Sequence, residues 1–136
     1  MIYPTKTVLV LRRDLASWQV ANVSAFLTGG LAGQYPEIVG EPYRDGSGQG
    51  YAPLIREPVF VYGGDAADLT RTHARALSRG LKIAIYTAPL FKTNNDADNR
   101  ASVVGQQTAE LDLVGLGIHG ERKIIDKVIN SLKFLS

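Results

Sequence analysis

Two stretches of the sequence hold side chains that could bind a ligand. In the first, Arg12, Arg13 and Asp14 follow an apolar run, and Ser17 and Trp18 come shortly after them. Guanidinium groups bind anions, most of all beside a helix N-terminus, and a tryptophan ring can stack on a flat ligand. Each group also has a structural interpretation. The arginines and Asp14 could form an internal ion pair, and Trp18 could be a partly buried core residue.

The second stretch begins at Thr87, after another apolar run, and continues through a polar segment from Lys92 and Thr93 to Arg100. Its amides and hydroxyls could close over a ligand as a lid or clamp, although a solvated loop has the same composition. Asn22, one helical turn after Trp18, completes this set of candidate ligand-binding residues.

Other reactive side chains give weaker signals. Arg71, Arg75 and Arg79 recur every four residues and could follow a phosphate backbone, but a solvated helix face is the simpler interpretation. His73 lies among apolar positions and is predicted to be a core residue, while His119 stands in a Gly-Ile-His-Gly corner. With two histidines, no cysteine and no nucleotide-binding glycine motif, we expect neither a metal site nor a cofactor.

The elements that must position these side chains alternate along the chain. Four apolar runs predict strands at residues 5–12, 57–64, 81–88 and 111–118. Helical spacing predicts helices at residues 17–31, 66–79 and 122–135, the second capped by Asp65, and a short helix at residues 96–104. This order implies an α/β protein, a three-layer α/β/α sandwich around a sheet of about four strands, mixed but mostly parallel. Ligands bind such sheets at the carboxyl ends of the strands, where both stretches would meet.

The chain is expected to form one domain over residues 1–136, with an insertion at residues 37–55. Asp45, Gly46, Ser47 and Gly48 form a turn signal, so the insertion could be a hairpin, a plain loop or a lid over the site. No apolar run reaches the roughly 18 residues that cross a bilayer, and cysteine is absent, so we expect a cytoplasmic protein without membrane contact. The net charge of +2, from 15 basic and 13 acidic residues, is too small to attract nucleic acid unless the cations cluster.

Several segments resemble the archaeal and eukaryotic type of peptidyl-tRNA hydrolase. "KTVLVLRRDL" is similar to that family's opening strand, "LSRGLKIAIYTA" to a helix end and the third strand, and "LVGLGIHGERKIIDKVINSLKFL" to its last strand and helix. The resemblance covers nearly the whole chain and implies the peptidyl-tRNA hydrolase II-like fold. The inserted "YRDGSGQGYAPLI" favours one of the uncharacterised families that share this fold.

The resemblance does not extend to the family's catalytic residues. The family's lysine at the start of the first helix falls within Ser17-Trp18-Gln19, and its aspartate after the third strand falls on Thr87-Ala88-Pro89. Its glutamine and histidine in the first helix fall on Asn22 and Ala25, and its threonine before the last strand falls near Leu113, with Thr108 as a substitute after a shift of alignment.

We therefore weigh three hypotheses and leave open whether the protein is an enzyme. The preferred one is binding of a small ligand, with an anion as one option, at the carboxyl edge of the sheet. The alternative is a divergent hydrolase acting on the ester bond of peptidyl-tRNA, with Lys92 or Arg13 replacing the lysine and Asp14 or Asp96 the acid; tRNA would then be a partner. The third is a structural module that forms a homodimer through an exposed apolar surface. The candidate ligand-binding residues are Arg12, Arg13, Asp14, Ser17, Trp18, Asn22, Thr87, Lys92 and Thr93.

Overall fold

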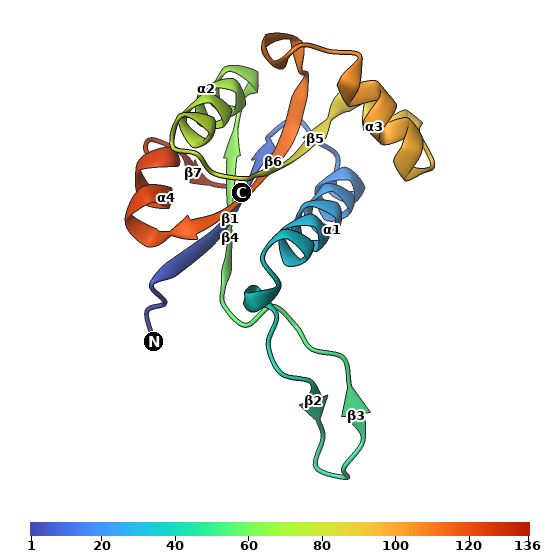
Figure 1. Cartoon of the computed structure of the whole chain (residues 1–136), viewed down its shortest axis with the longest axis vertical. Helices are drawn as coiled ribbons and strands as arrows, with labels where there is room; N and C mark the ends of the chain where they lie inside the picture. Colours follow the sequence, from blue (N-terminus) through green and yellow to red (C-terminus); the bar gives the residue numbers. More distant parts are fainter.

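The computed structural model describes residues 1–136, which form a five-stranded sheet with helices on both faces (Figure 1). The strand order is β5-β6-β1-β4-β7. The strands of this sheet are β1 (Thr5–Arg12), β4 (Val59–Gly64), β5 (Ala84–Thr87), β6 (Leu113–Glu121) and β7 (Lys133–Phe134). The helices are α1 (Ser17–Gln34), α2 (Ala66–Ser78), α3 (Asp96–Val104) and α4 (Arg122–Val128), with short 3-10 segments η1 (Pro36–Ile38), η2 (Ala88–Lys92) and η3 (Thr108–Glu110). None of these helices combines the length and the hydropathy of a membrane-spanning segment.

The α/β class and the mixed sheet are confirmed, but the prediction of about four mostly parallel strands is wrong. β1 and β4 pair in parallel, whereas the β1–β6, β5–β6 and β4–β7 pairs are antiparallel. β6 runs against both of its neighbours, so β1 and β5 point the same way without pairing. The carboxyl ends of β1, β4 and β5 therefore still lie at one edge of the sheet.

The predicted helix over residues 122–135 is too long. α4 ends at Val128, and Ser131 has a positive φ of 79°, which turns the chain back toward the sheet. β7 then pairs with the end of β4, and Phe134 stacks on Tyr62 with ring centroids 4.9 Å apart. The first apolar residues of this segment lie on a helix face and the last ones in an edge strand. Helical spacing alone does not show where the helix ends and the strand begins.

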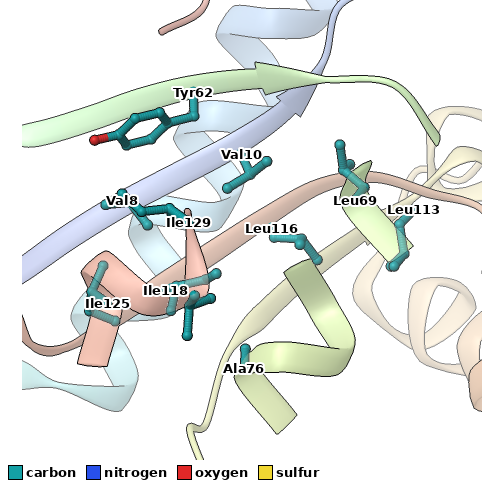
Figure 2. Close-up of a cluster of buried hydrophobic side chains, with 11 residues drawn as sticks. Val8, Val10, Tyr62, Leu69, Ala76, Leu113, Leu116, Ile118, Ile125 and Ile129 are labelled. Carbon is teal, nitrogen blue, oxygen red and sulfur yellow. The ribbon is translucent and has the colours of Figure 1, made fainter. Parts of the chain in front are cut away.

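Two apolar cores lie on opposite faces of the sheet. The even-numbered side chains of β1, Val8 and Val10, face α2 and α4, and Figure 2 shows this core with Leu116 and Ile118 of β6. The other face holds a core of Leu9 and Leu11 with residues of α1 and η1. This alternation follows from the two-residue period of a strand covered on both sides.

Gly115 of β6 allows α1 to approach the sheet. A β-carbon at this position would lie 2.6 Å from Val23 Cγ1 and 3.0 Å from Leu27 Cδ1. His73, on the sheet-facing side of α2, is buried as predicted, and Asp65 caps α2 by accepting a hydrogen bond from the Asp68 backbone NH at 2.8 Å.

A buried polar cluster joins β1, β6 and the start of β4 at the opposite edge from Trp18. Thr5 and Thr7 donate hydrogen bonds to the Glu57 carboxylate at 2.9 and 2.8 Å, and His119 Nδ1 lies 2.7 Å from Thr7 Oγ1. Thr7, Glu57 and His119 are 0%, 6% and 4% exposed. His119 therefore lies within a strand, with Tyr35 at 4.9 Å between ring centroids, and not in a corner before the last helix.

The insertion contains a hairpin of β2 (Tyr43–Arg44) and β3 (Gly50–Tyr51). Asp45 Oδ1 accepts from the backbone NH groups of Ser47 and Gln49 at 2.9 and 3.0 Å, which closes the turn. The hairpin projects from the body of the protein beyond the C-terminal end of α1 (Figure 1). Trp18 stands at the other end of α1, so the hairpin does not cover that site.

Candidate functional site

A cavity of about 370 Å³ lies between the N-terminal half of α1 and the segment after β5. It stands at the carboxyl edge of β1 and β5, where ligands are favoured in α/β sheets. The cavity is lined by four aromatic residues, one leucine, four asparagines, a threonine and an aspartate: Trp18, Phe26, Tyr86, Phe91, Leu90, Asn22, Asn94, Asn95, Asn99, Thr93 and Asp96.

The aromatic rings form one connected group. Trp18 meets Phe91 edge to face at 5.9 Å, Phe91 lies 5.0 Å from Tyr86, and Tyr86 meets Phe26 edge to face at 5.8 Å. Trp18 and Phe26 are 63% and 57% exposed, so Trp18 is not the partly buried core residue that we had considered. Exposed rings beside a cavity give a flat ligand apolar surface at low entropic cost.

Polar side chains from α3 and from the three residues that join η2 to α3 form another wall. Asn95 caps α3 by accepting from the Asp98 backbone NH at 2.8 Å, and its own amide donates to Asn94 Oδ1 at 3.0 Å and to Asp98 Oδ2 at 2.9 Å. Thr93 donates to the Leu90 carbonyl at 3.0 Å and also contacts Asn99 Oδ1. These contacts hold several amide groups in fixed positions at the rim.

Tyr86 and Asn22 bring polar atoms to the aromatic side. Asn22 Nδ2 donates to the Tyr86 hydroxyl at 3.4 Å. Burial raises the pKa of Tyr86, and the hydrogen bond from Asn22 acts in the opposite direction. The hydroxyl therefore stays protonated at neutral pH and can donate or accept a hydrogen bond.

The candidate residues from the sequence are divided among several places. Trp18, Asn22 and Thr93 line the cavity, whereas Ser17 and Lys92 are exposed and do not. Thr87 is 3% exposed and lines a separate hollow of about 210 Å³ with residues of α3 and η3. Arg12, Arg13 and Asp14 border a third hollow of about 180 Å³ near the start of α2.

Arg12 and Asp14 form the internal ion pair that we had weighed against anion binding. The guanidinium donates to both oxygens of Asp14, at 3.1 and 2.7 Å, and lies 3.5 Å from Asp112. Hydrogen bonding between them raises the pKa of Arg12 and lowers the pKa of Asp14. Arg13 donates to the carbonyls of Gly63 and Lys133 at 3.3 and 3.4 Å.

Sequence reasoning missed Phe26, Tyr86 and Phe91 as site residues. Phe26 lies two turns after Trp18 on the same helix, so its spacing from Trp18 and Asn22 was an available signal. Tyr86 lies in β5 and Phe91 in η2, which follows it. The sequence does not show that η2 packs against α1, where Phe91 contacts both Trp18 and Tyr86.

No group of three or more histidine, cysteine, aspartate or glutamate side chains is placed to hold a metal ion. The cavity also holds no pair of nucleophile and general base, because Asp96 is its one carboxylate and forms an ion pair with Arg100. The arrangement is therefore suited to binding by stacking and by amide hydrogen bonds.

Comparison with known proteins gives a family and a solved structure that is similar over the whole chain. The structure of Atu0240 from Agrobacterium tumefaciens strain C58, a protein of unknown function, superposes with a TM-score of 0.95 at 38% identity, covering 99% of this chain and 100% of that one. A search of curated proteins finds no match. These findings agree with our preference for an uncharacterised family and give no support for the resemblance to peptidyl-tRNA hydrolases. Residues 5–136 match a family described as protein of unknown function, and the chain thus belongs to the DUF2000 family.

Proposed function

We propose that the protein binds a small, flat, uncharged nitrogen heterocycle in the cavity beside Trp18. The observation that carries this proposal is the lining, in which four aromatic rings face amide and hydroxyl groups. Aromatic rings stack on a planar ligand, and asparagine amides both donate and accept hydrogen bonds at the edge of a heterocycle. A ligand ring between Trp18 and the polar wall would stack on the aromatic side chains and form hydrogen bonds with the amides.

The lining is unsuited to the anionic option that the sequence suggested. It contains no lysine, arginine or histidine, and its charged residue is Asp96. The predicted cations lie outside the lining: Lys92 is exposed beside it, Arg12 pairs with Asp14, and Arg13 donates to main-chain carbonyls. An anion in this cavity would lose its hydration without gaining an opposite charge.

The hydrolase alternative gains no support from this geometry. Lys92 does not line the cavity, and Asp14 and Asp96 are paired with Arg12 and Arg100. Arg13 and Asp14 border one hollow, but Asp14 is paired with Arg12 and Arg13 donates to main-chain carbonyls, so both are engaged in contacts within the protein. We prefer a binding protein to a hydrolase on this ground.

Fluorescence titration of Trp18, the single tryptophan, tests the proposal directly. We expect adenine, cytosine or nicotinamide to quench or shift its emission at saturable concentrations, and phosphate and benzoate to have no effect. Asn22→Ala removes an amide from the lining and should weaken heterocycle binding by about fivefold to tenfold, the effect of one hydrogen bond.

Gln34→Ala is the matched control, because it removes an amide from the exposed C-terminal end of the same helix. Its affinity should equal that of the unmodified protein. Saturable binding of benzoate or phosphate, without a response to any of the heterocycles, would contradict the proposal.

A further inference from the structure

A second concave site lies on the opposite face of the sheet, between α2 and α4. These helices lie side by side in Figure 1, away from α1. The groove between them has a volume of about 610 Å³ and is lined by Arg75, Arg79, Lys123, Asp126, Lys127 and Asn130. No apolar side chain contributes to its lining.

The four cations of this groove have no carboxylate partner. No acidic oxygen lies within 4.0 Å of the charged nitrogens of Arg75, Arg79, Lys123 or Lys127. The acid in the groove, Asp126, is bound to Lys6 at 2.8 Å and its charge is offset there. A protein with a net charge of +2 thus places four unpaired positive charges in one hollow.

Part of the groove is held in place by main-chain contacts. Arg75 donates to the Asn130 carbonyl at 3.0 Å, so its guanidinium spans from α2 to the end of α4. Arg79 donates to the Arg75 carbonyl at 3.1 Å, near the C-terminal end of α2. Each arginine uses part of its five N–H donors in these contacts and keeps others for a ligand.

The cations line two walls of the groove, one from each helix, and do not form a single track along one helix. Arg71, which would extend the stripe of Arg75 and Arg79, is paired with Asp68 at 2.6 Å. Within each wall the two cations stand four residues apart, a rise of about 6 Å, and the walls face each other across the groove. This arrangement suits a compact ligand of high negative charge better than an extended backbone.

We infer that the groove binds an oligophosphate group, two or more phosphates joined through shared oxygens. Arginine guanidinium and lysine ammonium groups are the groups that bind phosphate oxygens best. A ligand with several negative charges would also offset the repulsion among the four cations. The lack of aromatic or apolar lining means that only the phosphate groups are recognised here. The site is separate from the cavity beside Trp18, which lies across the sheet.

Calorimetric titration with inorganic triphosphate tests this inference, because that probe carries no ring that could enter the aromatic cavity. We expect saturable binding that weakens as salt is added. The double variant Lys123→Gln, Lys127→Gln should lose affinity by about tenfold or more, since each lost charge-assisted hydrogen bond is worth at least several-fold. Amide resonances in α2 and α4 should shift on titration, and those of α1 should not.

The double variant Lys82→Gln, Lys92→Gln is the matched control, because it removes the same charge from exposed positions outside the groove. It should bind triphosphate within about twofold of the unmodified protein, as expected for distant, screened charges. The inference is overturned if triphosphate does not bind, or if both double variants lose affinity equally. It is also overturned if a single-stranded oligonucleotide binds and triphosphate fails to displace it, since that result would indicate an extended track.

Discussion

Replacing Glu57 with alanine removes the acceptor at the centre of the buried polar cluster. Two threonine hydroxyls donate to its carboxylate at 2.9 and 2.8 Å, and His119 Nδ1 lies 3.5 Å away. Each of the two hydrogen bonds that the carboxylate accepts is worth about 1.5–3 kcal/mol, so losing both costs about 3–6 kcal/mol, less what relaxation of the cluster recovers. We expect Glu57→Ala to lower the free energy of unfolding by about 3–5 kcal/mol.

Urea unfolding followed by circular dichroism measures this loss. For a chain of this length, 1 kcal/mol corresponds to about 3–4 °C in Tm, so thermal unfolding should show Tm lowered by roughly 9–20 °C. Glu57→Gln keeps the shape and one acceptor oxygen, and should cost less than Glu57→Ala. Glu41→Ala, at an exposed position of the insertion, should change the free energy of unfolding by no more than about 0.5 kcal/mol.

The same cluster fixes the tautomer of His119. A carboxylate cannot donate, so the single hydroxyl proton of Thr7 goes to Glu57, and Thr7 Oγ1 must accept from His119 Nδ1 at 2.7 Å. Proton NMR should therefore show a slowly exchanging Nδ1–H resonance for His119, which Glu57→Ala should alter. Equal stability of the Glu57→Ala and Glu41→Ala variants would refute this reasoning.

Three further expectations concern packing, pH and assembly. Gly115→Ala should cost about 1–3 kcal/mol in urea unfolding, because its β-carbon meets Val23 at 2.6 Å, whereas Gly29→Ala, with open space around it, should not destabilise the protein. Burial lowers the pKa of His73 from its usual 6.5, so the native state binds fewer protons than the unfolded state; stability should fall as the pH drops from about 7 to about 5, and less steeply in His73→Leu. A homodimer remains a prediction. We expect it to use the exposed hairpin side chains, so that Tyr51→Ser should shift sedimentation velocity toward the monomer.

The elements predicted with the correct bounds are those whose ends depend on nearby residues in the sequence, such as a capping side chain. β1 and α3 have the predicted bounds, and α2 begins after the predicted Asp65 cap. The end of the chain was mispredicted because Ile124, Ile125 and Val128 have helical spacing that continues past the point where the chain turns. Only pairing with β4, through Leu135 NH to the Val61 carbonyl at 3.0 Å, stabilises the last residues as a strand.

The sequence indicates which edge of the sheet carries the cavity, but not most of the side chains that line it. The carboxyl ends of β1 and β5 lie at one edge, and Trp18 and Thr93 line the same cavity there. Phe91 reaches Trp18 because η2 turns the chain back over α1, a contact between segments about seventy residues apart that no local pattern encodes.

The arginines that follow β1 made anion binding one option at the sheet edge, with an internal ion pair as the other, and in the structure these arginines join strands. Arg12 links the end of β1 to Asp112, the residue before β6, and Arg13 holds the carbonyl of Lys133 in β7. A cation at a strand end has carbonyl and carboxylate oxygens close by, and hydrogen bonds to these oxygens use donors that a ligand would otherwise bind. In the groove between α2 and α4, by contrast, the four cations have no carboxylate within 4.0 Å, and the acid there, Asp126, is paired with Lys6. The unpaired cations therefore lie on the surface of α2 and α4 and not at the strand ends, where the cavity is lined by aromatic and amide groups.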